Sequence, residues 1–145
     1  MRGAVPDRSH LRIYLDSNVL FSASYIASSP YRNFWKLTQV TPVTSLYAVG
    51  EVIRHNVISS QRERFDELIA RTERVSDADL GFVPQSIRLV EKDRPILAAA
   101  IAASADYLVT GDKSHFAHLY STRVSGVCVI HPTDFLARQE DRLPD

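Results

Sequence analysis

The sequence predicts an α/β fold in which short parallel strands alternate with helices. Apolar runs of strand length occur at residues 11–15, 106–110 and 126–131, and a turn or a segment with helical spacing follows each of them. This alternation is typical of a parallel sheet covered by helices. The chain has 145 residues, of which 45% are hydrophobic, and this is enough for one domain with its own core.

No internal repeat or linker divides the sequence. We expect a loosely ordered lead-in at residues 1–10, a single domain at 11–138 and a tail at 139–145. The longest apolar stretch, residues 96–105, is much shorter than the roughly 20 residues of a membrane span, and the N-terminal segment lacks the apolar region of a signal peptide. The single cysteine, Cys128, suits a reducing compartment. We therefore expect a soluble cytoplasmic protein that does not associate with membranes.

The first half of the chain contains two predicted strands and four predicted helices. Pro30 is well placed to begin the second helix, because its fixed φ suits the first helical position. Thr44 or Ser45 can cap the third helix. The strands are expected at 11–15 and 40–45, and the helices at 17–28, 31–39, 46–57 and 61–74. The last of these helices is amphipathic, and its expected core residues are Phe65, Leu68, Ile69 and Thr72.

The second half has a simpler pattern. We predict a helix at 94–104, a strand at 106–110, a strand at 126–131 and a final helix at 132–139. Residues 75–90 show no periodicity, and no element is assigned to them.

Four acidic residues, Asp16, Glu51, Asp93 and Asp112, are candidates for one metal site. Asp16 ends the first strand, Asp112 follows the strand at 106–110, and Asp93 opens an alanine-rich helix. The carboxyl ends of parallel strands converge on one crevice, so these residues can meet there. Clustered carboxylates repel one another unless a cation neutralises them, and Mg²⁺ and Mn²⁺ prefer such oxygen ligands.

Each of these residues also has a purely structural explanation. Asp16 or Ser17 can cap the helix that follows, the macrodipole of its helix favours Asp93, and Asp112 lies in a sequence that forms an ordinary turn. Periodicity places Glu51 on the solvent side of its helix. The expected apolar stripe of that helix consists of Leu46, Val49, Ile53 and Val57.

Other functions have weaker support in the sequence. His115, His118 and His131 offer a rival zinc site, but their spacing matches no known zinc motif. The sequence contains no GxxxxGK[ST], GxGxxG, GxSxG or HExxH motif. The haloacid dehalogenase pattern requires a second aspartate two residues after the first, where this chain has Asn18, and the paired acids of a receiver domain are missing. The 17 basic and 17 acidic residues balance, so net charge neither indicates nor excludes a nuclease.

The acidic residues and their surroundings resemble the PIN-domain family, small metal-dependent nucleases that include the toxins of VapBC-type toxin–antitoxin pairs. The similar segments are LDSNVLFSA at 15–23, TSLYAVGEVIR at 44–54 and DRPILAAAIAASADYLVTGDK at 93–113. The resemblance implies a three-layer α/β/α sandwich with a five-stranded parallel sheet. It also implies that Glu51 faces the crevice, which periodicity did not predict.

The resemblance further implies hydrolysis of RNA phosphodiester bonds with one or two Mg²⁺ or Mn²⁺ ions. Asp16, Glu51, Asp93 and Asp112 would be catalytic residues and metal ligands, while Asn18 and Thr110 would hold them in place. No covalent intermediate is expected. Many relatives carry a further aspartate shortly after the position of Asp112, where this chain has Ser114 and His115.

The expected partners are RNA, a second copy of the chain and an antitoxin protein. The homodimer is predicted because a small domain has little room to bury a cluster of large apolar side chains, and such residues are common at interface cores. These residues are Tyr25, Ile26, Tyr31, Phe34 and Trp35. The alternative function is a catalytically silent PIN-like module that binds RNA or protein.

Overall fold

A central sheet organises the fold, which is described here for residues 10–55 and 58–144 of a computed structural model. The strand order is β3-β2-β1-β4-β6-β5, and all neighbouring strands are parallel except β5 and β6. The strands are β1 (Leu11–Leu15), β2 (Val40–Ser45), β3 (Glu73–Val75), β4 (Tyr107–Val109), β5 (Arg123–Val124) and β6 (Val127–Ile130).

The mixed α/β class and the parallel sheet are confirmed, with one difference in strand number. Five strands, β3, β2, β1, β4 and β6, form the parallel sheet, and the two-residue strand β5 adds a sixth, antiparallel member at one edge. Neither β5 nor β3 was predicted, because their sequences, RV and ERV, contain no apolar run of strand length.

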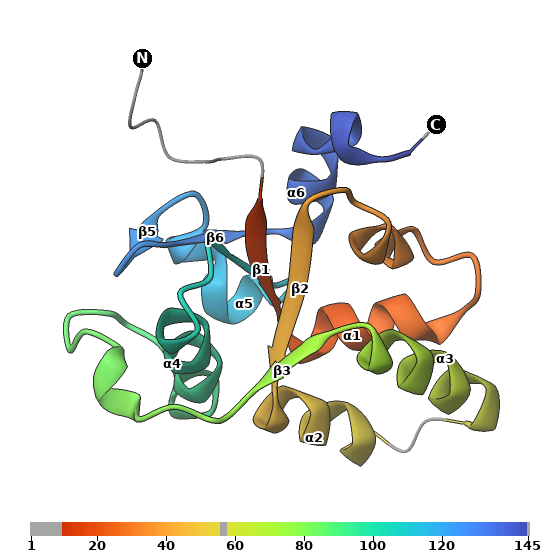
Figure 1. Cartoon of the computed structure of the whole chain (residues 1–145). Helices are drawn as coiled ribbons and strands as arrows, with labels where there is room; N and C mark the ends of the chain where they lie inside the picture. The colour runs from red at the N-terminus through yellow and green to blue at the C-terminus, as the bar shows by residue number, and fades with distance from the viewer. Residues whose placement is uncertain (1–9, 56–57, 145) are drawn as a thin grey trace.

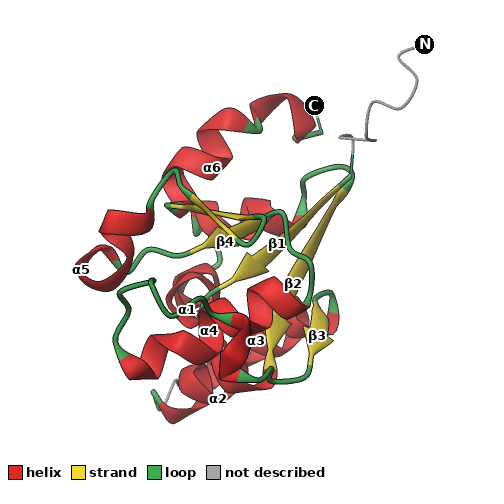
Figure 2. Cartoon of the chain, turned by 90° about the vertical axis from the view of Figure 1, so that its left-hand side faces the viewer, coloured by secondary structure: helices red, strands yellow, loops and turns green. Residues whose placement is uncertain are grey.

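Helices lie on both sides of the sheet. In Figure 1, α1 and α3 lie to one side of strands β1 and β2, while α4 and α5 lie to the other, and Figure 2 shows the same layers after a quarter turn. The α-helices are α1 (Ser17–Tyr25), α2 (Leu46–Arg54), α3 (Ser59–Ala70), α4 (Arg94–Ala102), α5 (Lys113–Phe116) and α6 (Pro132–Arg138). The 3₁₀ helices are η1 (Pro30–Trp35), η2 (Leu80–Phe82), η3 (Glu91–Asp93), η4 (Ala117–Leu119) and η5 (Glu140–Arg142).

The segment after Pro30 is a 3₁₀ helix and not the α-helix that the sequence predicts. Side chains three residues apart eclipse one another in a 3₁₀ helix. This geometry brings Tyr31 close to Phe34, with ring centroids 6.0 Å apart, and both Phe34 and Trp35 are buried. Packing of adjacent aromatic residues therefore determines the helix type here.

Helix α3 also ends earlier than predicted. Its four expected core residues are buried, but the chain leaves the helix after Ala70 and Glu73 begins strand β3. The Thr72 hydroxyl donates to the Leu68 carbonyl at 2.6 Å, and Glu73 forms a bidentate pair with Arg12 of β1, both contacts at 2.9 Å. This pairing with the central strand overrides the local preference for helix.

The aromatic group that led us to expect a homodimer divides between core and surface. Phe34 is fully buried, and Trp35 is 9% exposed with its indole N–H donating to Thr72 at 2.8 Å. Tyr25 and Ile26, in contrast, are 52% and 49% exposed. Tyr25 and Ile26 are therefore the most exposed members of the group, and Tyr31 is partly buried.

The remaining expectations about organisation concern the ends of the chain. Residues 1–9 of the lead-in predicted at 1–10 lie outside the described part of the chain. The same is true of residues 56–57, at the end of the helix predicted at 46–57. Within that part, no helix has the length and apolar character needed to cross a bilayer. After α6 the backbone N–H of Thr38 donates to the Arg142 carbonyl at 2.8 Å, so η5 lies against the segment before β2.

Candidate metal centre

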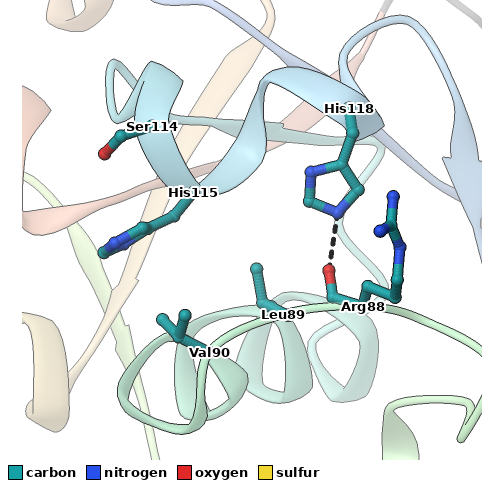
Figure 3. A pocket seen from close by; sticks show the side chains of 6 residues that line it. All are labelled: Arg88, Leu89, Val90, Ser114, His115 and His118. Atoms are coloured by element: carbon teal, nitrogen blue, oxygen red, sulfur yellow. Dashed lines mark hydrogen bonds between the residues drawn. The ribbon is translucent and has the colours of Figure 1, made fainter.

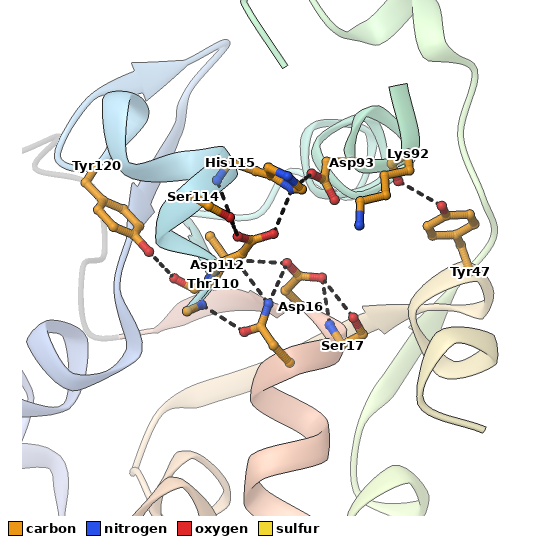
Figure 4. A network of polar contacts seen from close by, with 12 residues as sticks. Asp16, Ser17, Tyr47, Lys92, Asp93, Thr110, Asp112, Ser114, His115 and Tyr120 are labelled. Atoms are coloured by element: carbon orange, nitrogen blue, oxygen red, sulfur yellow. Dashed lines mark hydrogen bonds and ion pairs between the residues drawn. The ribbon is translucent and has the colours of Figure 1, made fainter. Parts of the chain in front are cut away.

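The candidate site lies where the chain reverses its direction across the sheet. From β1 the chain moves to β2 and β3, and it then returns to β4 on the other side of β1. The carboxyl ends of the two strands at such a switch point flank an open crevice. Asp16 follows β1 and Asp112 follows β4, and the two residues are the N-caps of α1 and α5. Asp93 precedes α4 in the same region (Figure 4).

Asp16 is held by three donors at the bottom of the crevice. Its Oδ1 accepts the Ser17 backbone N–H at 2.7 Å, and its Oδ2 accepts the Thr110 hydroxyl at 2.8 Å and the Asn18 amide at 3.1 Å. The pKa of Asp16 is raised to about 6, mainly by burial and to a smaller extent by the charges of Glu51 and Asp93, while the bonds from Thr110 and Ser17 oppose the shift. The fold therefore keeps a carboxylate where its charge is costly.

Asn18 connects the two strands that carry the site. Its Nδ2 donates to Asp16, and its Oδ1 accepts the backbone N–H of Gly111 at 2.8 Å. A Cβ on Gly111 would lie 3.2 Å from that Oδ1, so glycine permits the close approach. Asn18 and Thr110 thus both donate to Asp16, and their role in holding a metal ligand stays a prediction.

Asp93, Asp112 and His115 form a second, tighter group. Nδ1 of His115 lies 2.6 Å from Oδ2 of Asp93 and 2.9 Å from Oδ2 of Asp112. The other Asp112 oxygen accepts the Ser114 hydroxyl at 2.8 Å. Burial raises the pKa of Asp93, and the charge of Asp112 adds to this, while the imidazole of His115 opposes it.

The same group also has the donor atoms of a metal site. Oδ2 of Asp93 and Nδ1 of His115 are buried, and neither makes a hydrogen bond of acceptable geometry to any described residue in spite of their short separation. Asp93, Asp112 and His115 each offer one ligand atom, and these atoms lie within 4.8 Å of one another. Two carboxylate oxygens and one imidazole nitrogen suit divalent ions such as Mn²⁺.

His115 was not predicted as a ligand beside Asp93 and Asp112, but as part of a rival zinc site with His118 and His131. The structure separates these three, because His118 contacts the Arg88 carbonyl at 2.6 Å and His131 accepts the Thr133 N–H at 3.2 Å. The useful signal was the spacing from Asp112, since residues three apart share one face of a helix.

Glu51 lies beside the site but outside the tight group. It lines a small cavity of about 120 Å³ together with Ser17 and Asn18, and its charge acts on Asp16. In the described part of the chain, neither Asp16 nor Glu51 belongs to a group of three residues whose ligand atoms all lie within 4.8 Å of one another. The structure thus brings Asp93 and Asp112 together with His115, and leaves Asp16 and Glu51 as close neighbours.

The apolar stripe predicted for the helix of Glu51 is wrong at Leu46 and Ile53, whereas Val49 packs against the core and Val57 lies outside the described residues. Leu46 and Ile53 are 58% and 42% exposed, whereas Ala48 and Val52 are buried. Helix α2 packs through these smaller residues, four positions apart, and this rotation moves Glu51 from the predicted solvent side to the cavity. Hydrophobic periodicity identifies the most apolar face of a helix, but the face of α2 that packs against the core is a different one.

Comparison with known proteins identifies the family. Residues 12–114 match the sequence model of the PIN domain. The chain belongs to the PIN-domain family. The match covers β1 to the start of α5, and so includes every residue of this candidate metal centre except His115, which lies one position beyond its end.

The fold of this PIN domain also occurs among solved structures. A chain of the crystal structure of VapBC2 from Rickettsia felis, bound to a DNA fragment from the promoter, is similar with a TM-score of 0.61. The sequences are 17% identical over 83% of this chain and 98% of that chain. At this level of identity the likeness concerns the fold. No curated protein matches this sequence.

Proposed function

We propose that this PIN domain is a metal-dependent endoribonuclease and the toxin of a toxin–antitoxin pair. The observation that carries the proposal is the group of Asp93, Asp112 and His115, whose ligand atoms lie within 4.8 Å of one another at the switch point of the sheet. Family membership supports nuclease chemistry, and the similar VapBC2 chain supports a toxin. Residues 11–138 would form the functional unit.

The residues divide into ligands and supports. Asp16, Glu51, Asp93 and Asp112 would be the catalytic residues and would hold Mg²⁺ or Mn²⁺, with His115 as a further ligand beside Asp93 and Asp112. When bound, the metal would supply an activated water and stabilise negative charge on the phosphate. Thr110 and Asn18 keep Asp16 in one orientation through the bonds described above, and the Tyr120 hydroxyl in turn donates to the Thr110 carbonyl at 2.7 Å. Phosphodiester hydrolysis by such a site requires no covalent intermediate.

The proposed partners are an RNA substrate, an antitoxin protein and a second copy of the chain. The substrate is RNA, in the cytoplasm, and a cognate antitoxin would block the site. Exposed Tyr25 and Ile26, at the C-terminal end of α1, support a homodimer, because closed two-fold dimers are the commonest soluble oligomers and aromatic residues are enriched at their interfaces. A monomer mass in light scattering at micromolar concentration would contradict the dimer.

Cleavage of a mixed RNA pool tests the activity. The wild-type protein should cleave with Mg²⁺ or Mn²⁺ and stop when EDTA is added, while Asp93→Asn should be inactive with unchanged circular dichroism. Asp79→Asn is the matched control, since Asp79 is exposed and caps η2 through the Gly81 N–H at 2.7 Å. Equal cleavage by wild type and Asp93→Asn would indicate a contaminating nuclease. RNA binding without cleavage would favour the silent module.

A further inference from the structure

A second cavity adjoins the candidate metal centre. It measures about 360 Å³ and lies between the segment Arg88–Val90 and the start of helices α5 and η4 (Figure 3). Ser114, His115 and His118 form its wall on the helical side. Its size falls at the lower end of the range for small-molecule sites, roughly 300–1,000 Å³.

His115 belongs to both the cavity and the metal centre. Its Nδ1 lies 2.6 Å and 2.9 Å from the carboxylates of Asp93 and Asp112, and the same residue lines the cavity. A group bound in the cavity would therefore lie directly beside a phosphate that a metal ion at these carboxylates would hold. This adjacency is the geometry that a chain of nucleotides requires.

The cavity combines apolar and planar groups. Leu89 and Val90 supply apolar surface, and Val90 is 45% exposed. His118 has its ring fixed by the contact between its Nε2 and the Arg88 carbonyl at 2.6 Å. The Arg88 side chain extends alongside that ring (Figure 3), and no carboxylate in the described part of the chain pairs with it.

We propose that this cavity binds the nucleoside next to the scissile phosphate of a single-stranded RNA, a role that rests on the ribonuclease function proposed above. Proteins recognise unpaired bases by stacking them on histidine and aromatic rings and on guanidinium planes. His118 and Arg88 provide such groups in a fixed arrangement, and Leu89 and Val90 accept the flat face of a base. The Arg88 guanidinium would also approach a neighbouring phosphate.

Nucleotide binding in the absence of metal tests the site separately from catalysis. The probes are AMP, GMP, CMP and UMP, with ribose 5-phosphate as the control without a base, all in EDTA. NMR signals of the histidine ring protons report the binding position. We expect at least one nucleoside monophosphate to shift the His118 signals, and ribose 5-phosphate to leave them unchanged.

Two variants with matched controls complete the test. Val90→Trp should fill the cavity and weaken nucleotide binding on the order of tenfold, the size of one lost stacking contact. Leu80→Trp adds the same ring at a residue that is 48% exposed and does not line the cavity, and it should bind as wild type. Arg88→Ala should weaken binding, whereas Arg62→Ala, which removes only an exposed pair with Asp66 on α3, should not.

The possible results separate the two proposals. One result would overturn the nucleoside site and leave the nuclease intact. In that case the wild type cleaves RNA, no nucleotide shifts the His118 signals, and Val90→Trp does not change the position of cleavage. Shifts of His118 that Val90→Trp abolishes, in a protein that cleaves no RNA, would support the site and refute the nuclease. Equal shifts with ribose 5-phosphate would show that only phosphate binds, and this would also overturn the proposal.

Discussion

Replacement of Asp16 by asparagine should change how protein stability depends on pH. Burial raises the pKa of Asp16 from 3.8 to about 6, so the native protein holds its proton over a pH range in which the unfolded chain has lost it. The free energy of unfolding of metal-free wild type therefore falls as pH rises through this range and is constant above it. Asparagine cannot ionise, so this contribution is missing from the variant.

The magnitude follows from the two pKa values. The difference between 3.8 and about 6 corresponds to about 3 kcal/mol in total, of which about 2 kcal/mol falls between pH 4.5 and 7.5. Asparagine also presents an amide N–H to one of the donors Ser17, Thr110 and Asn18, at a cost of about 1–3 kcal/mol. That cost does not vary with pH, so the pH dependence of the free energy of unfolding can be measured separately from it.

Urea denaturation at several pH values in EDTA measures both quantities. The free energy of unfolding of Asp16→Asn relative to wild type should rise by about 2 kcal/mol from pH 4.5 to 7.5. Asp79→Asn controls for loss of an exposed charge with a similar backbone contact. Parallel pH curves for Asp16→Asn and wild type would refute the argument that burial raises the pKa of Asp16.

Three further predictions concern the metal centre and the core. His115→Ala should lower Mn²⁺ affinity at least about tenfold in electron paramagnetic resonance titrations, because imidazole suits transition metals. The affinity for Mg²⁺, measured by its competition with Mn²⁺, should fall less, and an equal effect on both ions would contradict a nitrogen ligand. Thr110→Val should weaken metal binding about 10- to 100-fold by releasing Asp16, and unchanged binding in the same titration would remove Thr110 from this role. Trp35→Ala should cost about 3–5 kcal/mol in urea denaturation, whereas a cost below about 1 kcal/mol would contradict its burial, and the oligomeric mass in light scattering should not change.

The parts of the fold with long, regular patterns were predictable from the sequence. Strands β1, β2, β4 and β6 and helices α1, α4 and α6 lie close to their predicted positions, because each combines an apolar run with a clear start signal. Strand β3 and helix α5 were missed. Each has three or four residues, and their formation depends on contacts such as Arg12 with Glu73, which connect residues far apart in sequence.

The candidate site was predictable in its aspartates and less so in its other members. Asp16 and Asp112 follow strands, so the topology of a parallel sheet brings them to one crevice. Glu51 could not be placed by periodicity, since the face of α2 that packs is not its most apolar one. His115 joins the site through the turn of α5, an element that the sequence pattern did not indicate.

The central position of β1 in the sheet has a consequence for synthesis of the protein. Strand β1 pairs with β2, which follows it closely in sequence, and with β4, which begins only at Tyr107. A chain still being made can assemble β1 and β2 early, since domains form from the N-terminal side as they leave the ribosome. Asp93 and Asp112 reach Asp16 only after β4 has joined β1, so nascent chains lack the complete acidic centre until most of the sequence has been translated.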